Sequence, residues 1–317
     1  MTMTISRLVL GSMTFGDTVD ADTAASMIDR ALDAGVTMID TANGYAGGAT
    51  ETMLGDLLQS RRDRVRLATK AGMPHPDAGD RPLLSAAALR ACVEGSLRRM
   101  RVNQVDLFYL HQPDRSTTLE ETLSTIAELV AEGKIGQLGV SNYAAWQIAE
   151  INHVADAVGA PRPIVAQQLY NLLARRVEEE YLEFAQTTGL QTMVYNPLGG
   201  GMLSGKHQFE ERPTSGRFGD SRLAAMYTER YWNPELFAAI KDLATIADEA
   251  GLPLSEMALR WLLSQDAVSS VLLGGSKVTH LDANLAAAAR GPLPPDVLKA
   301  CAEVGVRLRG PMPAYNR

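Results

Sequence analysis

The amino-acid sequence predicts a closed barrel of eight parallel β-strands surrounded by α-helices, an α/β protein with the (β/α)8 or TIM-barrel fold. Short runs rich in Val, Ile and Leu alternate along the chain with stretches of helical periodicity, as expected for a parallel sheet covered by helices. Eight such runs are present, which is enough to close a barrel, and a chain of 317 residues suits one large barrel. We therefore expect residues 1–317 to form one domain.

The apolar runs are the expected strands, and most of them end at a polar residue or a glycine. In chain order they are residues 6–11, 36–40, 65–70, 105–111, 135–141, 164–169, 191–195 and 269–273.

Helical periodicity occupies most of the segments between these strands. In the first helix, expected at residues 22–34, Ala24, Met27, Ile28, Ala31 and Leu32 fall on one face, and the following glycine ends the helix. Further helices are expected at 85–100, 119–132, 144–158 and 177–188, with another starting at about residue 279.

Two segments depart from this alternation. Residues 207–232 form a polar connection that is too long for an ordinary loop, and long loops on a compact barrel are usually functional. The tail at residues 309–317 has two prolines and no helical period, and we expect it to fold over the barrel mouth.

Composition limits the classes of partner and the compartment. The net charge of −7 argues against nucleic acid or an anionic membrane as the main partner, because phosphate binding requires a basic face. The two cysteines, Cys92 and Cys301, lie in helical patterns, which fits a reducing compartment without disulfides. No segment has the layout of a signal peptide or the length of a membrane span, so a cytoplasmic protein is expected.

Polar side chains at strand ends predict the active site. Asp40 ends the second strand and Tyr45 follows it, while Lys70 ends the third strand and His111 the fourth. In a barrel of this type, active-site groups come from the carboxyl ends of strands and the loops that follow them. Each residue alone has an ordinary explanation, such as a helix cap or a solvated rim side chain. All four together predict a catalytic site.

These four side chains suit a proton donor. A free tyrosine has a pKa of about 10, and a lysine ammonium about 4 Å away contributes on the order of 4 kcal/mol, enough to lower that pKa by up to ~3 units. We expect Asp40 to keep Lys70 charged and to reduce this effect, and His111 to donate a hydrogen bond to a substrate carbonyl oxygen. Such a site would protonate an oxyanion as it forms, which suits hydride delivery to a carbonyl.

Glycine-rich segments after the last two strands predict the site for the hydride carrier. No Gly-x-Gly-x-x-Gly follows the first strand, so a Rossmann site is not indicated. Residues 195–206 are rich in glycine, and their backbone amides could approach a pyrophosphate, with a structural turn as the alternative. Gly200 to Lys206 nearly match the P-loop spacing, but His207 replaces the hydroxyl that would bind Mg²⁺. Residues 274–277 form a second candidate anion site before a helix.

Several motifs resemble the aldo-keto reductases along nearly the whole chain. They are Ile39-Asp40-Thr41-Ala42-x-x-Tyr45, Thr69-Lys70, Leu110-His111, Gly139-Val140-Ser141-Asn142, Gln167-x-x-Tyr170-Asn171 and Tyr195-Asn196-Pro197-Leu198. The run Val105 to His111, the motif Gly216-Arg217-Phe218, the stretch Tyr227 to Trp232 and the ending Pro313 to Arg317 are similar to the aflatoxin-aldehyde reductase branch, which also reduces succinic semialdehyde and dicarbonyls. The resemblance implies a barrel enzyme that reduces carbonyls with NADP(H), and it leaves a homodimer open.

The resemblance also implies a role for each matching residue. Tyr45 would be the general acid, supported by Asp40, Lys70 and His111. The residues implied for the coenzyme are Ser141, Asn142 and Gln167 at the nicotinamide amide, Tyr195 on its ring, Asn196, Pro197, Leu198, Gly199, Gly200, Gly201, Met202, Leu203, Ser204, Gly205, Lys206 and Arg217 at the pyrophosphate, and Ser276, Lys277 and Asn284 at the adenosine end. Asp40 is also implied as a coenzyme contact. Those implied for a substrate carboxylate are Tyr227, Arg230 and Arg317.

One position departs from the family pattern, and two other functions stay open. His280 stands where many relatives have Arg or Gln near the 2′-phosphate, which weakens the preference for NADPH, although Lys277 supplies one positive charge there. The chain could instead be a coenzyme-binding regulatory subunit with little turnover. It could also be a Schiff-base aldolase, but Lys70 would then need a depressed pKa, which Asp40 opposes. No metal site is indicated.

Overall fold

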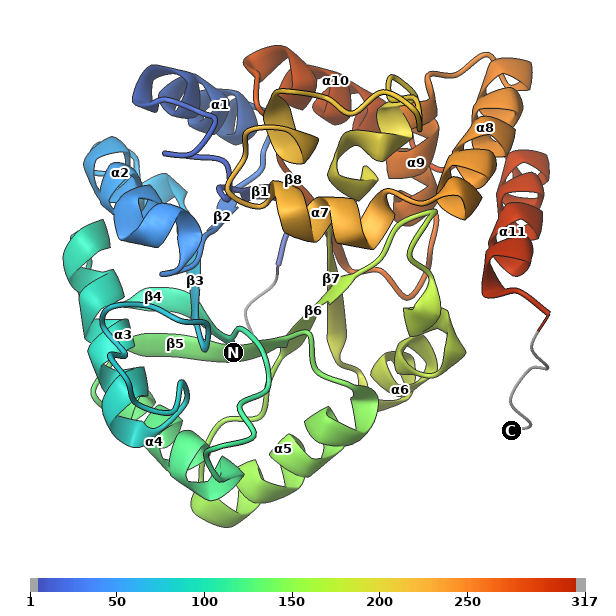
Figure 1. Ribbon diagram of the computed structural model, residues 1–317. Coiled ribbons are helices and arrows are strands. Elements are labelled where there is room, and N and C mark those ends of the chain that lie inside the picture. Colours follow the sequence, from blue (N-terminus) through green and yellow to red (C-terminus); the bar gives the residue numbers. More distant parts are fainter. Residues whose placement is uncertain (1–4, 312–317) are drawn as a thin grey trace.

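The computed structural model describes residues 5–311 and contains eight parallel strands that close into a barrel (Figure 1). Each strand pairs with the next in chain order, and β1 pairs with β8 to close the ring. The strands are β1 Leu8–Gly11, β2 Met38–Asp40, β3 Arg66–Ala71, β4 Val105–Leu110, β5 Ile135–Ser141, β6 Val165–Leu169, β7 Gln191–Tyr195 and β8 Ser270–Leu273. The expected barrel is confirmed, and each strand boundary lies within two residues of the expected one.

Successive residues of a strand pack into two different cores. On β2, Met38 lies in the barrel interior with Val9 and Leu107, whereas its neighbour Ile39 packs in the layer between strands and helices. The side-chain period of two produces this alternation. Because both faces of each strand are covered, the strands read as continuous apolar runs in the sequence.

Eleven α-helices within the described residues surround or cover the strands. They are α1 Ala21–Asp33, α2 Ala49–Leu57, α3 Ala86–Met100, α4 Leu119–Ala131, α5 Ala145–Val158, α6 Tyr181–Thr188, α7 Ala224–Tyr231, α8 Pro234–Glu249, α9 Leu254–Leu263, α10 Val278–Ala289 and α11 Pro295–Arg309. In α1 the Asp20 side chain accepts a hydrogen bond from the Thr23 N–H at 2.8 Å and caps the helix. Its buried residues are the five that the periodicity places on one face.

The expected helix at residues 177–188 is wrong in its first part. A 3₁₀ turn, η3 (Arg176–Glu179), precedes α6, and Glu180 between them has non-helical dihedrals of φ −154° and ψ −46°. Glu178 explains the interruption, because its carboxylate accepts hydrogen bonds from the Tyr170 hydroxyl at 2.6 Å and Arg175 Nε at 2.7 Å. These tertiary contacts determine the local conformation.

The long connection at residues 207–232 is ordered and partly helical. It contains the 3₁₀ turn η5 (Gly216–Phe218) and the helix α7. The Tyr231 hydroxyl accepts hydrogen bonds from Asn171 Nδ2 at 3.1 Å and Asn196 Nδ2 at 3.0 Å, which follow β6 and β7. This segment is therefore anchored on the carboxyl ends of two strands.

Three expectations concern the tail, the cysteines and membrane spans. Residues 312–317, including Arg317, lie outside the described residues, so the expected fold of the tail over the barrel mouth is not tested. Cys92 and Cys301 are buried free thiols. None of the helices in residues 5–311 combines the length and the apolar character needed to cross a bilayer.

Candidate active site

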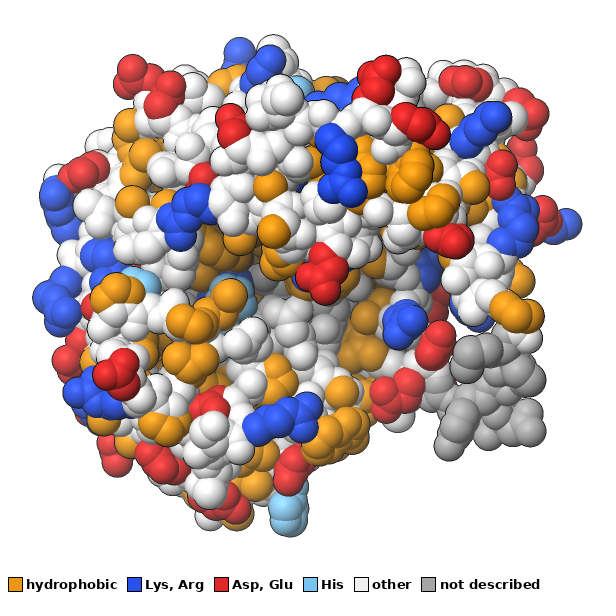
Figure 2. All heavy atoms as spheres, viewed as in Figure 1, with side chains coloured by type: hydrophobic (Ala, Val, Ile, Leu, Met, Phe, Trp, Pro, Cys, Tyr) orange, Lys and Arg blue, Asp and Glu red, His pale blue; other side chains and the backbone are white. Residues whose placement is uncertain are grey.

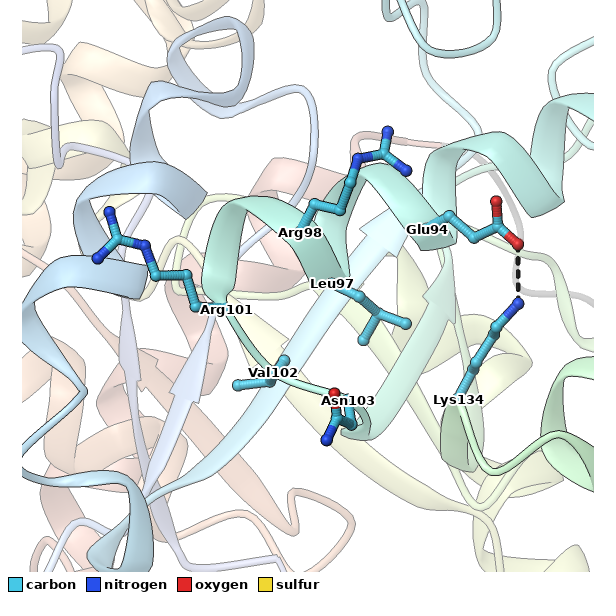
Figure 3. A pocket seen from close by; sticks show the side chains of 7 residues that line it. All are labelled: Glu94, Leu97, Arg98, Arg101, Val102, Asn103 and Lys134. Carbon is cyan, nitrogen blue, oxygen red and sulfur yellow. Dashed lines mark hydrogen bonds and ion pairs between the residues drawn. The ribbon is translucent and has the colours of Figure 1, made fainter.

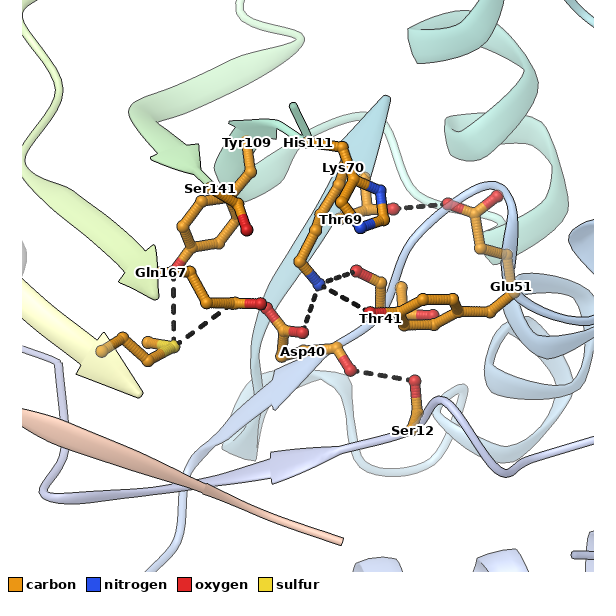
Figure 4. A network of polar contacts seen from close by, with 12 residues as sticks. Ser12, Asp40, Thr41, Glu51, Thr69, Lys70, Tyr109, His111, Ser141 and Gln167 are labelled. Atoms are coloured by element: carbon orange, nitrogen blue, oxygen red, sulfur yellow. Dashed lines mark hydrogen bonds and ion pairs between the residues drawn. The ribbon is translucent and has the colours of Figure 1, made fainter. Parts of the chain in front are cut away.

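The carboxyl ends of β2, β3 and β4 bring the four expected catalytic side chains together. Asp40 ends β2, Lys70 lies near the end of β3, His111 directly follows β4, and Tyr45 begins the 3₁₀ turn η1 (Tyr45–Gly48). Lys70 Nζ donates hydrogen bonds to the Asp40 carboxylate and to the Thr41 carbonyl oxygen, the latter at 2.7 Å (Figure 4). It also donates to the Tyr45 hydroxyl at 3.4 Å. The parallel register of the barrel thus converts scattered sequence positions into one cluster.

Lys70 and Asp40 form a fully buried ion pair. Burial alone lowers the pKa of Lys70, but Asp40 and Tyr45 together outweigh it, so the pKa lies above its ordinary value. Burial raises the pKa of Asp40, while Lys70 and a hydrogen bond from Gln167 act in the opposite direction. A lysine in this environment is held as an ammonium ion.

The pKa of Tyr45 differs from the sequence-based expectation. Burial raises this pKa above its ordinary value, and the opposing effect of Lys70 is smaller than the sum of burial and the Asp40 charge. The expectation of a net decrease is therefore wrong. Tyr45 is a protonated phenol at neutral pH, and Lys70 is the neighbour that makes its proton easier to remove.

His111 is a buried neutral imidazole beside Tyr45. The centres of the two rings lie 6.0 Å apart with an edge-to-face arrangement. Burial and the nearby Lys70 charge lower the pKa of His111 to about 3. Nδ1 of His111 is buried and has no hydrogen-bond partner among the described residues. A neutral imidazole at this position can donate one N–H to a ligand.

The residues expected at the nicotinamide lie on the adjoining strand ends. Gln167 Nε2 on β6 donates to Asp40 Oδ2 at 2.9 Å, which connects it to the catalytic cluster. Asn142 follows β5, and its Nδ2 donates to Ser141 Oγ at 3.0 Å. Asn142 Oδ1 accepts a hydrogen bond from the Tyr195 hydroxyl at 2.7 Å. Ser141, Asn142, Gln167 and Tyr195 therefore occupy one continuous part of the rim.

The glycine-rich segment after β7 forms the 3₁₀ turn η4 (Gly199–Ser204). Three successive glycines, residues 199–201, have φ values of 57°, 71° and 106°, a region that favours glycine. At Gly200 an added Cβ would lie 2.5 Å from the Tyr227 ring, so no larger residue fits. Met202 and Leu203 are buried in the hydrophobic core, so only their backbone could face a ligand.

Two arginines of the long connection contact the ring of Tyr227. The Arg217 and Arg230 guanidinium carbons lie 4.9 Å and 5.9 Å from its centre. Arg217 Nη1 is buried and has no hydrogen-bond partner among residues 5–311, which is unusual for a charged donor. Burial raises the pKa of Tyr195 to about 12, with Arg230 acting in the opposite direction, so Arg230 lies near the end of β7.

Positive charges gather at the start of α10. Lys277 is the cap residue of this helix, and His280 lies in its first turn. Burial lowers the pKa of His280, and the charges of Lys206 and Lys277 lower it further. The end of the glycine-rich segment therefore lies near the start of α10. Ser276 is exposed here, and Asn284 is buried one turn after His280.

The sequence reasoning did not single out the residues that enclose Lys70 from other sides. The Tyr109 ring centre lies 5.6 Å from Lys70 Nζ, and the Tyr109 hydroxyl contacts Met193 Sδ at 3.4 Å. The period of two on β4 was an available signal, since Tyr109 lies two residues before His111. Glu51, which accepts a hydrogen bond from Thr69 behind the site, has no such local signal.

The site lies on a hollowed face of the molecule. Figure 2 shows the hollow near the centre of the view, with hydrophobic side chains around it. A separate shallow hollow of about 470 Å³ is drawn in Figure 3 and lies where β4 and β5 begin, at the opposite ends of these strands. It contains none of the expected site residues. Within residues 5–311 no three His, Cys, Asp or Glu side chains are grouped to hold a metal ion.

Comparison with known proteins agrees with this geometry. The model of the Aldo/keto reductase family matches residues 7–305. Human Aldo-keto reductase family 7 member A3 is 39% identical over 307 residues, which cover 92% of this chain and 91% of that protein. Human Aflatoxin B1 aldehyde reductase member 4 is 38% identical with the same coverage. A probable voltage-gated potassium channel subunit beta from Arabidopsis thaliana is 32% identical, covering 89% of this chain and 87% of that protein.

Proposed function

The chain belongs to the aldo/keto reductase family, and we propose that it is an NADPH-dependent reductase that converts aldehydes and reactive ketones or dicarbonyls into alcohols. The observation that carries this proposal is the Tyr45 hydroxyl, held 3.4 Å from Lys70 Nζ next to a neutral His111. The names of the aflatoxin aldehyde reductases among its relatives support an aldehyde as the substrate. The match over residues 7–305 supports a single catalytic domain.

Each member of the cluster has a chemical role in this proposal. Tyr45 is protonated at neutral pH, and its hydroxyl donates a proton to the carbonyl oxygen as that oxygen gains negative charge. The Lys70 ammonium stabilises the phenolate that is left behind, and Asp40 holds the ammonium in place. The neutral imidazole of His111 donates an N–H to the same carbonyl oxygen and orients it.

The surrounding residues fit a nicotinamide dinucleotide, which when bound supplies the hydride. The glycines of η4 allow a pyrophosphate to approach the backbone closely, and the unpaired Arg217 Nη1 offers a buried donor to an anion. Ser141, Asn142 and Gln167 would hold the nicotinamide amide under Tyr195. Lys277 and His280 would face the 2′-phosphate, with Ser276 and Asn284 at the adenosine.

A carboxylated aldehyde such as succinic semialdehyde is the finer part of the proposal. Arg230 lies against the ring of Tyr227 and close to Tyr195 at the end of β7, so a substrate reaching Tyr45 would pass near its guanidinium. A guanidinium suits a carboxylate because it can donate two parallel hydrogen bonds. Arg317, proposed as the second carboxylate contact, lies outside the described residues.

A coenzyme-binding regulatory subunit is the second candidate function. It is favoured by the 32% identity to a probable potassium channel subunit beta. The complete set of Asp40, Tyr45, Lys70 and His111 favours turnover instead. The Schiff-base aldolase loses support, because the pKa of Lys70 is raised by Asp40 and Tyr45 against the effect of burial.

The test is NADPH oxidation by the purified protein with short aldehydes, dicarbonyls and carboxylated aldehydes. We expect turnover with at least one class, and loss of turnover in Lys70→Met with NADPH binding retained. Tight NADPH binding without turnover on any carbonyl would instead support the regulatory subunit. Borohydride trapping of a covalent adduct at Lys70 would support the aldolase.

A further inference from the structure

A buried polar cluster lies directly behind Tyr45 and outside the proposed catalytic set. Its centre is Glu51, in the first turn of α2 and fully buried. Glu51 Oε1 accepts a hydrogen bond from the Thr69 hydroxyl at 2.6 Å (Figure 4). Glu51 Oε2 accepts one from Arg99 Nε at 2.8 Å. Arg99 Nη1 in turn donates to Asp77 Oδ2 at 2.8 Å. A fully buried carboxylate is costly unless it is paired in this way.

The segment between Tyr45 and Glu51 has an unusual backbone. Ala46, Gly47 and Gly48 have φ values of 45°, 64° and 95°, and alanine adopts such a conformation only at an energetic cost. A Cβ at Gly48 would lie 3.2 Å from Arg99 Nε, so this backbone packs closely against the cluster. A strained turn keeps its shape only when its surroundings fix it. Arg99 is the charged side chain that lies against this turn, and Glu51 holds Arg99 through a hydrogen bond.

Thr69 connects this cluster to the catalytic lysine. It directly precedes Lys70 on β3, and the alternation of the strand directs the two side chains to opposite faces. Lys70 Nζ contacts the Tyr45 hydroxyl in the barrel interior, while the Thr69 hydroxyl contacts Glu51 on the helix side. A short series of residues therefore connects Tyr45 with Lys70 on the helix side of the site. It runs from Tyr45 through the strained turn to Glu51, and from there through Thr69 to Lys70.

We propose that Glu51 and Thr69 are positioning residues, and that the hydrogen bond between them sets the placement of the Tyr45 hydroxyl relative to Lys70 Nζ. This inference rests on the proposed function, since it concerns the efficiency of the same proton donor. The role differs from that of Lys70 because neither residue faces the substrate.

The geometry explains why a small displacement matters. At 3.4 Å the contact between Lys70 and Tyr45 is already long for a hydrogen bond, so further separation would weaken it steeply. The charged or titratable groups around the Tyr45 hydroxyl are Lys70, Asp40, Tyr227 and the neighbouring His111. The Lys70 charge lowers the pKa of Tyr45, whereas the Asp40 charge raises it. A looser turn would make Tyr45 a weaker acid.

The experiment compares three substitutions of buried threonines. Thr69→Val removes the hydroxyl at nearly constant volume, and Thr69→Ser keeps it. Thr192→Val is the matched control, because Thr192 is a fully buried strand residue whose hydroxyl contacts the Tyr181 hydroxyl at 3.2 Å, away from the catalytic cluster. The measurements are kcat, the single-turnover rate of aldehyde reduction, KM, the NADPH dissociation constant and the thermal midpoint. Glu51→Gln serves as a second change in the same contact.

We expect Thr69→Val to lower the single-turnover rate by about 10- to 100-fold, the range that a displacement of about 1 Å can cause. NADPH affinity and KM should hardly change, and the alkaline limb of the rate profile should move to higher pH. Thr69→Ser should restore the rate. Thr192→Val should lower the thermal midpoint and leave the single-turnover rate unchanged. Equal rates in Thr69→Val and wild type, or a fall that Thr192→Val reproduces, would overturn the proposal.

A second readout does not depend on turnover. NMR of the protein labelled at the tyrosine Cζ follows the ionisation of Tyr45, whose resonance is identified by its loss in Tyr45→Phe. We expect this resonance to titrate at higher pH in Thr69→Val than in wild type and in Thr69→Ser, and an unchanged titration would contradict the proposal. If the wild-type protein reduced no carbonyl, the proposed function would be wrong. The titration of Tyr45 would still test whether Glu51 and Thr69 position it.

Discussion

A lysine ammonium buried in a barrel needs an acceptor for each of its three N–H groups, and Lys70 has one for each. The Asp40 carboxylate, the Thr41 carbonyl oxygen and the Tyr45 hydroxyl all accept from Nζ. An ammonium that lacked such partners would lose its proton or destabilise the fold. At this scale the chemistry and the stability of the site depend on the same three contacts.

Tyr45→Phe should abolish nearly all carbonyl reduction and leave NADPH affinity within a few-fold of wild type. The reason is that phenylalanine keeps the ring and loses only the acidic hydroxyl. General acid catalysis is typically worth ~10²–10⁴-fold, so a kcat above about a tenth of the wild-type value would contradict the assignment. Tyr181→Phe, which removes another buried hydroxyl, should keep full activity. Steady-state kinetics and fluorescence titration of NADPH measure both effects.

Arg230→Ala should impair the reduction of succinic semialdehyde more than that of an uncharged aldehyde of similar length. Losing one charge-assisted contact costs ~1.5–3 kcal/mol, or roughly 10- to 150-fold in kcat/KM. Arg222→Ala is the control, because Arg222 is an exposed arginine of the same connection. Equal losses on both substrates, or none on either, would assign Arg230 to structure or solubility. Removal of Arg317 tests the second proposed contact in the same assay.

Two elements lie near each other at the proposed coenzyme site. The η4 turn supplies glycine backbone with positive φ, and the first turn of α10 supplies a helix N-terminus beside Lys277. His280 in this first turn lies near Lys206 and Lys277, whose charges lower its pKa in addition to the effect of burial. A phosphate at this junction would meet the charges of Lys206 and Lys277 and the N-terminus of α10.

We expect the protein to bind NADPH more tightly than NADH by ~1.5–3 kcal/mol, roughly 10- to 150-fold, if one charged hydrogen bond to the 2′-phosphate decides the preference. Lys277→Ala should remove most of this difference, because the ammonium recognises only the phosphate. Its effect on NADH should be small. Fluorescence titration of both coenzymes measures the ratio, and equal dissociation constants in the wild type would refute the expectation.

At the scale of the whole molecule, the closed barrel places the carboxyl ends of all eight strands at one rim. The proposed coenzyme contacts come from the ends of β2, β5, β6, β7 and β8 and from the segments that follow the last two. A ligand that bridges so many strands should stabilise the folded barrel as a unit.

Saturating NADPH should therefore raise the thermal midpoint of the whole protein in a single transition. At 100 times the dissociation constant the stabilisation is ~2.7 kcal/mol, which corresponds to a shift of about 5 °C for a protein of this size. Tyr45→Phe should show the same shift, since it keeps the coenzyme contacts. Differential scanning calorimetry measures both, and a shift confined to part of the transition would show that the barrel does not respond as one unit.

The sequence by itself predicted the features that depend on short-range patterns. Runs of Val, Ile and Leu located all eight strands, and the helical period identified the buried face of α1. The convergence of Asp40, Lys70 and His111 also followed from the sequence. Once the strands are parallel and close a barrel, a residue at the carboxyl end of any strand must lie on the same rim.

Only the tertiary structure decided how these residues affect one another. Whether the pKa of Tyr45 rises or falls depends on its burial and on its distance from Lys70, and neither quantity is contained in a local pattern. The hydrogen bond between Glu51 and Thr69 joins residues 18 positions apart, and the one between Asp40 and Gln167 joins residues 127 positions apart. The periodicity of a sequence predicts which face of a strand or helix a side chain occupies, because backbone geometry is local. Which residue that side chain contacts is determined by the closure and packing of the complete barrel.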